Sequence, residues 1–401
     1  MKEEKKTTPP LAKLARELAP SGIRRFFDIA ASMQDVISLG VGEPDFVTPW
    51  AVREAAIYSL ERGQTTYTSN YGLIELRKLI SEHLQERYSV NYRPDDEILV
   101  TVGVSEGMDL AMRTILDPGD EVLVPEPCYV SYKPCVTLAG GIAVGIATSA
   151  ENDFCVSASQ LQAASTSKTK AILLGFPSNP TGATMPRAAL EEIVKLAVAS
   201  NWFIISDEIY DRLSYDEMHN CVSSIPGAFE RTILLNGFSK AYAMTGWRLG
   251  YVCAPEAILT PMMRIHSYTM LCAPITSQKG AIEALRSCES AVQDMISQYN
   301  RRRKFIVAGL NKIGLQCHLP KGAFYAFPSI ASTGLTCEEF AERLLFEEHV
   351  AVVPGTAFGM GGENHIRCSY ATSLEKIETA LIRMGRFVER LSGKSLVEQS
   401  R

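Results

Sequence analysis

The sequence predicts an α/β protein with a large, mostly parallel sheet and a smaller α+β part. Three observations lead to this prediction. The chain has 401 residues, which is too long for one ordinary hydrophobic core. From about residue 98, short apolar runs without polar alternation recur, and stretches of helical spacing lie between some of them. After residue 280, helical patterns dominate and short strand-like runs are mixed among them.

The first part of the chain predicts a short strand over Asp35–Leu39, a turn over Gly40–Asp45 and a helix over Pro49–Glu61. Ala188–Ala199 predicts one of the helices that lie between later strands. Runs of four to six apolar residues are typical of strands that are buried on both faces. These runs are Ile98–Val102, Glu121–Val124, Ala171–Phe176, Trp202–Ser206, Thr232–Leu235 and Leu249–Ala254.

The last part of the chain begins with a long predicted helix that includes Cys288–Gly309. An α+β arrangement follows in the segments Gly322–Phe327, Cys337–His349, Val350–Val353, His365–Tyr370 and Leu374–Leu391. We expect the N-terminal segment to return to this part. The predicted large domain therefore covers residues 46–290, and the predicted small domain covers residues 1–45 and 291–401.

Net charge, apolar runs and cysteine spacing limit the partners and the cellular location that we expect. The formal charge is 40 − 45 = −5, so no positive field favours nucleic acid or an anionic membrane. No apolar run approaches the roughly 20 residues of a membrane helix, and the charged start Met1–Lys6 predicts no signal peptide. The ten cysteines form no Cys-x-x-Cys pair, so we expect no metal site. A reducing, cytoplasmic location is expected.

One segment, from Asn236 to Gly250, combines a lysine with small neighbours and an arginine. A lysine at the mouth of a buried sheet loses contact with water, which lowers its pKa and makes the amine of Lys240 nucleophilic. The Ser239 hydroxyl and the planar Arg248 guanidinium can both bind a phosphate. Without such neighbours, a lysine would more often be an exposed loop residue.

A second segment places a carboxylate at the end of a predicted strand. Asp207 and Tyr210 lie in Ser206–Tyr210, directly after an apolar run. A carboxylate at a strand end can face a bound ring, and beside a pyridine nitrogen it keeps that nitrogen protonated. Tyr210 can hydrogen-bond an oxygen on the same ring. Taken alone, this short segment would favour a helix cap.

Three strand-end positions are weaker signals when each is taken alone. Gly103–Ser105 follow a predicted strand and begin a helix, and backbone N–H groups at a helix N-terminus bind phosphate. Asn179 lies in Ser178–Gly182, which is typical of a turn. For Tyr129, core packing and stacking on a ring are about equal alternatives.

Three further positions come from different parts of the chain. Arg367 lies within the strand pattern His365–Tyr370, where a buried arginine needs an anionic partner. A structural salt bridge is the alternative interpretation of Arg367. Gly42 lies in the first turn and would bring the backbone close to a bound molecule. Tyr67, taken alone, is a loop residue.

In their order along the chain, these segments resemble the class I and II aminotransferases, which bind pyridoxal 5'-phosphate (PLP). The resemblance implies PLP fold type I, an aspartate aminotransferase-like α/β architecture, and extends from about Ser21 to about Arg390. Gly22–Ala30 resembles the branch of prokaryotic aromatic, broad-specificity and aspartate aminotransferases. The motifs are GEPDF, TYTSNYGL, GVSEG, NPTG, SDEIY, GFSKAYAMTGWR, KGAFY, VPGTAFG and IRCSYAT.

The resemblance implies a role for each singled-out residue. Lys240 would carry PLP covalently and act as the catalytic base. Arg367, Asn179 and Gly42 would bind the substrate. Tyr67 would reach across the interface of a homodimer to the partner's phosphate. The residues that would bind the cofactor are Gly103, Val104, Ser105, Tyr129, Asn179, Asp207, Tyr210, Ser239, Lys240, Arg248 and Tyr67.

The implied reaction moves an amino group from an L-amino acid to a 2-oxo acid, expected to be 2-oxoglutarate, by a ping-pong mechanism. Aromatic or broad specificity is favoured, because some aspartate aminotransferases of this branch carry a lysine where this chain has Ser105. Phe26, Tyr67, Tyr129 and Tyr268 either line an apolar pocket or pack elsewhere. Aspartate aminotransferase, carbon–sulfur β-lyase and a non-catalytic PLP-binding regulator remain alternatives.

Overall fold

The computed structural model describes Pro9, residues 11–18 and residues 33–392. Seven strands form the large sheet, in the order β2-β8-β7-β6-β5-β3-β4. Within it, β8 alone runs antiparallel to its neighbours, so the prediction of a mostly parallel sheet is confirmed. The strands are β2 (Ile98–Thr101), β3 (Glu121–Glu126), β4 (Ile142–Ala147), β5 (Thr169–Gly175), β6 (Phe203–Asp207), β7 (Thr232–Gly237) and β8 (Gly250–Cys253).

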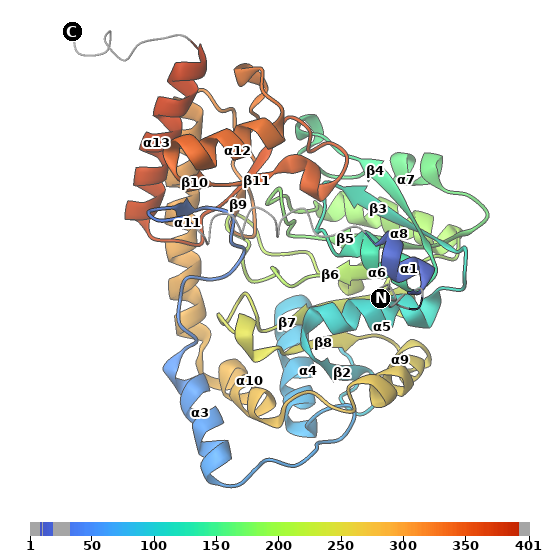
Figure 1. Ribbon diagram of the computed structural model, residues 1–401. Helices are drawn as coiled ribbons and strands as arrows, with labels where there is room; N and C mark the ends of the chain where they lie inside the picture. Colours follow the sequence, from blue (N-terminus) through green and yellow to red (C-terminus); the bar gives the residue numbers. More distant parts are fainter. Residues whose placement is uncertain (1–8, 10, 19–32, 393–401) are drawn as a thin grey trace, which may run out of the picture.

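Helices cover both faces of the large sheet (Figure 1). Successive residues of a strand point to opposite faces. Leu173 of β5 packs in the cluster that contains α5, α6 and α9, whereas its neighbours Ile172 and Leu174 pack with α7 and α8. Burial on both sides explains why these strands lack polar alternation. The helices are α5 (Gly103–Ile115), α6 (Tyr132–Leu138), α7 (Ala158–Ala164), α8 (Arg187–Ala199) and α9 (Glu256–Thr269).

The six apolar runs predicted as strands all correspond to strands, with ends that agree or differ by at most two residues. The sequence prediction missed β4. This strand is at the edge of the sheet, is partly exposed and contains Gly145, so its apolar pattern is weak.

A second group of elements lies beside the sheet and is reached through the long helix α11 (Glu289–Lys312), which runs along one side of the molecule in Figure 1. A three-stranded antiparallel sheet has the order β11-β12-β9. Val350–Val353, predicted as one piece, contributes to two different sheets. The elements are β9 (Tyr325–Ala326), α12 (Cys337–Glu348), β10 (Val350–Ala351), β11 (Val353–Pro354), β12 (Ile366–Ser369) and α13 (Leu374–Ser392).

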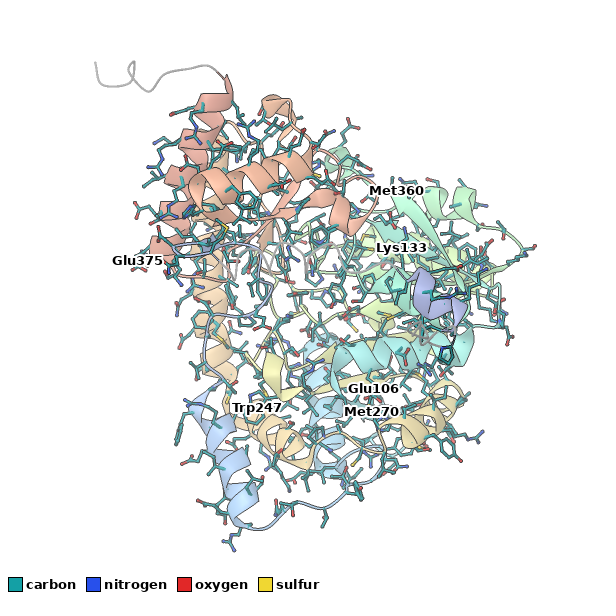
Figure 2. All side chains as sticks on the ribbon, viewed as in Figure 1. Glu106, Lys133, Trp247, Met270, Met360 and Glu375 are labelled. Atoms are coloured by element: carbon teal, nitrogen blue, oxygen red, sulfur yellow. The ribbon has the colours of Figure 1, made fainter. Side chains whose placement is uncertain are left out.

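The N-terminal strand β1 (Ile37–Ser38) pairs in parallel with β10, so the start of the described chain lies against its last third. The division into residues 46–290 and the remainder stays a prediction. The two groups also meet near the end of β3, where the backbone N–H of Met360 donates to Glu126, which pairs with Lys133 of α6. Figure 2 labels Met360 and Lys133 on this side of the molecule. The remaining helices are α1 (Lys13–Glu17), α3 (Trp50–Glu61), α4 (Ile74–Tyr88) and α10 (Ile275–Ser287). None of the described helices is long and apolar enough to cross a membrane.

Candidate active site

A cavity of about 720 Å³ lies at the carboxyl edge of the large sheet. Parallel strands end at the same edge, so loops from distant parts of the sequence meet there. Arg248 reaches the same edge because it precedes the antiparallel strand β8. The singled-out residues that line the cavity are Gly42, Val104, Ser105, Tyr129, Asn179, Asp207, Tyr210, Ser239, Lys240, Arg248 and Arg367.

Lys240 lies just after β7, where its ammonium group donates a hydrogen bond of 2.8 Å to the carbonyl oxygen of Gly42. The Nζ atom also lies 5.8 Å from the ring centroids of Tyr210 and Phe324. Burial lowers the pKa of Lys240 to about 8. Roughly a tenth of this side chain is therefore a neutral, nucleophilic amine at pH 7, far more than for an ordinary lysine.

Asp207 is the last residue of β6, and its carboxylate is buried. Tyr132 donates a hydrogen bond of 2.8 Å to Oδ2, and the backbone N–H of Ile209 donates one of 3.2 Å to Oδ1. Burial raises the pKa of Asp207 to about 6. Neither donor is a cation, so the site favours a positively charged partner for this carboxylate.

Tyr132 was not singled out from the sequence, although it lies three residues after Tyr129 in the same motif. Its hydroxyl occupies space beside β5 that is open only because residue 175 is glycine: a Cβ atom there would lie 2.3 Å from that oxygen. No local pattern links Tyr132 to Asp207, 75 residues later. Only the packing of α6 against the sheet brings them together.

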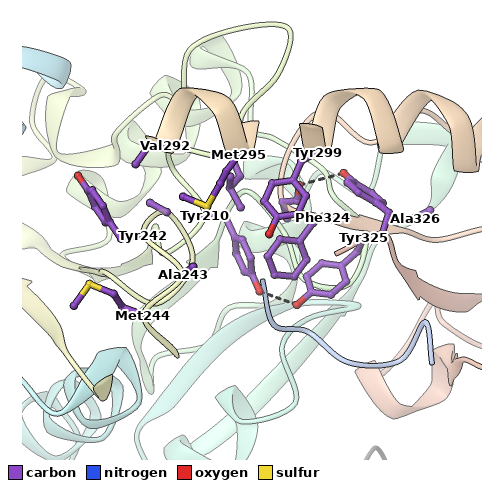
Figure 3. Packing of buried hydrophobic residues seen from close by; sticks show 14 of the residues in the cluster. Tyr210, Tyr242, Ala243, Met244, Val292, Met295, Tyr299, Phe324, Tyr325 and Ala326 are labelled. Carbon is purple, nitrogen blue, oxygen red and sulfur yellow. Dashed lines mark hydrogen bonds between the residues drawn. The ribbon is translucent and has the colours of Figure 1, made fainter. Parts of the chain in front are cut away.

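Tyr210 lies close to a second tyrosine that the sequence reasoning also missed. The hydroxyl groups of Tyr210 and Tyr325 are 2.7 Å apart, as the dashed line in Figure 3 shows. Tyr325 belongs to the KGAFY motif, which was the one available signal for it. A Cβ atom on Gly42 would lie 2.4 Å from the Tyr325 hydroxyl oxygen. The glycine therefore leaves room for the Tyr325 hydroxyl, and its approach to a bound molecule stays a prediction.

The first turn of α5 forms a cradle for an anion together with Arg248. The backbone N–H groups of the first turn have no partners within the helix. Gly103 has a φ of +75°, and a Cβ atom there would lie 2.8 Å from Nη2 of Arg248. Arg248 is held by a bond of 3.1 Å from Nη1 to the carbonyl oxygen of Thr245. These donors, with the hydroxyls of Ser105 and Ser239 at the cavity, fit a phosphate.

Arg367 lies in β12 with 3% of its surface exposed. Its Nη1 donates a bond of 2.8 Å to Oδ1 of Asn179, and its Nη2 donates to the carbonyl oxygen of Gly40. The guanidinium carbon lies 4.5 Å from the ring centroid of Tyr325 and 4.9 Å from that of Phe358. The Asn179–Pro180 peptide bond is cis.

The charge of Arg367 has no counterpart among the described residues. Its Nε atom is buried without a hydrogen-bond partner, and none of the ion pairs of the described chain includes this residue. Burial lowers its pKa, but a guanidinium stays charged. The interpretation as a structural salt bridge is therefore wrong for the described residues, and the arginine is suited to bind an anionic ligand.

Two aromatic positions lie away from the cavity of their own chain. Tyr67 is 79% exposed in the loop between α3 and α4, and Tyr268 is 91% exposed on α9. Neither lines the cavity, so Tyr268 does not contribute to an apolar pocket there. Phe26 and the segment Gly22–Ala30 lie outside the described residues.

The cavity also fits a flat ring that carries a phosphate. Tyr129 lines its wall, with its ring in edge contact with that of Tyr132, and the anion cradle, Lys240 and Asp207 line the same space. A phosphate, an electrophilic carbon and a protonated ring nitrogen would each find a complementary group. The residues therefore fit PLP by the chemistry of their donors and by the open cradle at Gly103.

Comparisons with known proteins point the same way. The family described as aminotransferase class I and II matches residues 34–384. YugH of Bacillus subtilis, named as an aminotransferase, is 52% identical over 96% of this chain and 99% of its own length. An aspartate aminotransferase of Pyrococcus abyssi is 48% identical over 91% of this chain and 95% of its own. The crystal structure of an aromatic aminotransferase from Pyrococcus horikoshii has a TM-score of 0.88 and 43% identity, covering 92% of this chain and 99% of that one.

Proposed function

This chain belongs to the class I and II aminotransferase family, and from this premise we propose that it transfers amino groups from aromatic or a broad range of L-amino acids to 2-oxoglutarate. The family and its relatives make the chain a PLP-dependent aminotransferase of fold type I.

PLP, when bound, supplies an aldehyde that takes up the amino group and a ring that stabilises negative charge on the substrate's Cα. We propose that Lys240 holds this aldehyde between turnovers. Its amine is then freed by the substrate and moves the Cα proton. The lowered pKa of Lys240 supports this role, because the amine must be neutral to accept a proton.

The residues around Lys240 are proposed to orient the ring. Asp207 would face the ring nitrogen and keep it protonated, and Tyr210 with Asn179 would face the ring oxygen. Tyr129 would stack on the ring. The first turn of α5, Ser239 and Arg248 would bind the phosphate. The support for these roles is that all of these groups face one cavity.

We propose that Arg367 and Asn179 bind the α-carboxylate of the substrate, with Gly42 close to it. The observation that carries this assignment is the buried Arg367 guanidinium, which has an unpartnered Nε and no carboxylate beside it among the described residues. A planar guanidinium can bind a carboxylate through two hydrogen bonds. Fixing the carboxylate also fixes the direction of the Cα–H bond.

The donor's side chain is the less constrained part of the proposal. The basic residues that line the cavity are Lys240, Arg248 and Arg367, and each already has a role. The described residues that line the cavity therefore include no further cation for a side-chain carboxylate, whereas Val41, Met108, Val130 and Cys135 offer apolar surface. This observation favours aromatic or broad specificity. Aspartate is the second candidate donor, because a relative named as an aspartate aminotransferase is 48% identical.

We also propose a homodimer in which Tyr67 reaches the partner's phosphate. Tyr67 is exposed, lies away from its own cavity and is accompanied by exposed apolar side chains. Such a group of exposed apolar residues is typical of an interaction surface. The residues concerned are Val47, Trp50, Ile57, Tyr58, Leu60 and Tyr67. A cytoplasmic location is proposed as well, since all ten cysteines are free thiols.

The test is a panel of amino donors with 2-oxoglutarate as acceptor. We expect phenylalanine or tyrosine to react with a kcat/KM about tenfold or more above that of aspartate. The reverse order would identify an aspartate aminotransferase. Release of pyruvate and ammonia from cysteine-like donors without a 2-oxo acid would identify a β-lyase. PLP binding without turnover of any donor would identify the protein as a non-catalytic PLP-binding regulator.

A further inference from the structure

A buried carboxylate outside the site described above ties the second group of elements to the large sheet. Glu126 is the last residue of β3 and is 0% exposed. Its Oε2 accepts a bond of 2.7 Å from the backbone N–H of Met360, and the Lys133 ammonium lies 2.6 Å from Oε1. Burying a carboxylate is costly unless it is paired and hydrogen-bonded. Here Oε2 is hydrogen-bonded, whereas the buried Oε1 has the Lys133 charge beside it but no hydrogen-bond partner.

The segment that Glu126 holds is the 355–362 loop, between β11 and β12. Short backbone bonds close it: the N–H of Gly355 donates to His365 at 2.9 Å, and that of His365 donates to Gly362 at 3.0 Å. A Cβ atom on Gly359, whose φ is +100°, would lie 2.4 Å from Oε2 of Glu126. The loop is therefore compact and fits directly against the carboxylate, so that fixing one of its residues fixes the others.

The same loop carries a side chain that touches Arg367. Phe358 is buried, and the guanidinium carbon of Arg367 lies 4.9 Å from its ring centroid. The carbonyl oxygen of Phe358 accepts a bond of 2.9 Å from the N–H of Cys128, which directly precedes Tyr129 at the cavity wall. The end of β3 is thus linked to Arg367 through Phe358 of the 355–362 loop, and to Tyr129 because that residue follows shortly after in the sequence.

We propose that Glu126, paired with Lys133, is a positioning residue that latches the 355–362 loop to the end of β3 and so holds Phe358 against the guanidinium of Arg367. This inference rests on the proposed role of Arg367 in binding the substrate's carboxylate. Glu126 does not line the cavity, so it acts through the loop and touches neither substrate nor cofactor. Loosening the latch should weaken carboxylate binding without changing the chemistry at Lys240.

The experiment compares Glu126→Gln with the wild-type holoenzyme. Two constants are measured: the KM for the amino donor and the Kd for a carboxylate that lacks an amino group. The carboxylate is 3-phenylpropanoate or, if aspartate is the better donor, succinate. We expect both to rise about tenfold, because the amide loses the attraction to the Lys133 ammonium and its NH2 group places a donor against either that ammonium or the Met360 N–H. The kcat should stay within about threefold, and the absorbance of bound PLP should not change. Lys133→Gln leaves the Met360 contact in place and should raise both values about threefold.

Glu97→Gln is the matched control. Glu97 is also buried, accepts a backbone N–H bond of 2.8 Å from Arg93 and pairs with the Arg93 guanidinium at 3.1 Å. It lies at the amino end of β2, opposite the cavity edge. A general loss of stability would affect both variants alike in thermal unfolding. The latch is refuted if Glu126→Gln lowers the melting temperature as Glu97→Gln does but leaves KM and Kd within twofold of wild type.

Arg367→Lys separates failure of the latch from failure of the proposed function. If this variant raises the Kd of the carboxylate and Glu126→Gln does not, only the latch is wrong. If Arg367→Lys leaves the Kd unchanged, the proposed role of Arg367 is wrong. Should Glu126→Gln fail to fold, Glu126→Asp keeps the charge but draws the carboxylate back from Met360, and the same rise in KM and Kd is expected.

Discussion

The cavity has two sides that are built in different ways. On the sheet side, Asp207 is the last residue of β6, while Lys240 and Arg248 both lie in the loop between β7 and β8. On the Arg367 side, the functional group lies inside strand β12, between the rings of Tyr325 and Phe358. The sheet side carries charges of both signs, whereas the buried charge on the Arg367 side is positive, and the Glu43 carboxylate that also lines the cavity is exposed.

The two sides also differ in how far their supporting contacts reach along the chain. Asp207 accepts a bond from the backbone of Ile209, and Arg248 donates to Thr245, so part of the sheet side is ordered within its own segments. Arg367 instead donates to Asn179, 188 residues away, and to Gly40, 327 residues away. The proposed roles of Asp207 and Arg248 concern the cofactor, and the proposed role of Arg367 concerns the substrate. Changes on the sheet side should therefore affect cofactor binding, and changes on the Arg367 side should affect substrate binding.

The largest expected effect comes from Lys240→Ala. Removing both the covalent attachment and the base should lower kcat by about 10⁴-fold or more. Steady-state turnover measures this loss, and borohydride reduction followed by peptide mapping locates the attached cofactor. PLP trapped on any other lysine of the wild-type protein would overturn the assignment and remove the distinction between the two sides.

Arg367→Lys tests the other side of the cavity. Lysine keeps the positive charge but cannot offer two parallel N–H donors, so we expect kcat/KM to fall by about 10²-fold. The absorbance of bound PLP should match that of wild type, because the change lies away from the ring. A loss of PLP as large as the loss of activity would mean that the two sides are not separate.

Asp207→Asn should change how the stability of the cofactor-free protein depends on pH. The pKa of about 6 in the folded state is above the ordinary 3.8. The protonated carboxyl therefore stabilises the fold below pH about 4, and that contribution is lost as the pH rises through about 6. The loss is on the order of 2 kcal/mol and should be absent in Asp207→Asn. Urea unfolding of both proteins at pH 4 and pH 7 measures it, and equal pH dependence would contradict the prediction.

The smallest effect is expected from Tyr132→Phe. The Tyr132 hydroxyl donates to the charged form of Asp207 and so lowers the pKa of that carboxyl. Without it, the pKa should rise further, the acidic limb of the activity profile should move to higher pH, and PLP should bind about threefold to tenfold less tightly. Spectroscopic titration with PLP and a pH–rate profile measure these changes. An unchanged acidic limb would show that Asp207 does not depend on Tyr132.

The sequence predictions succeeded where a feature depends on neighbouring residues and missed features that depend on contacts between segments far apart in the sequence. Strands such as Ala171–Phe176 were found because burial on both faces leaves a continuous apolar run. The edge strand β4 was missed because partial exposure and Gly145 break that pattern. Similarly, Lys240 was found within one distinctive segment, while Tyr325 was passed over because its role depends on a contact with Tyr210, 115 residues earlier.

The sequence by itself determined the alternation of strands and helices, the residues at the strand ends and the family that these residues resemble. Each of these features depends on neighbours within a few residues, through burial, turn chemistry and local motifs. The tertiary structure alone decided the strand order, the bond from Tyr132 to Asp207, the solitary charge of Arg367 and the contact of Glu126 with Met360, 234 residues away. Such contacts depend on how distant segments pack, and spacing along the chain carries no record of that packing.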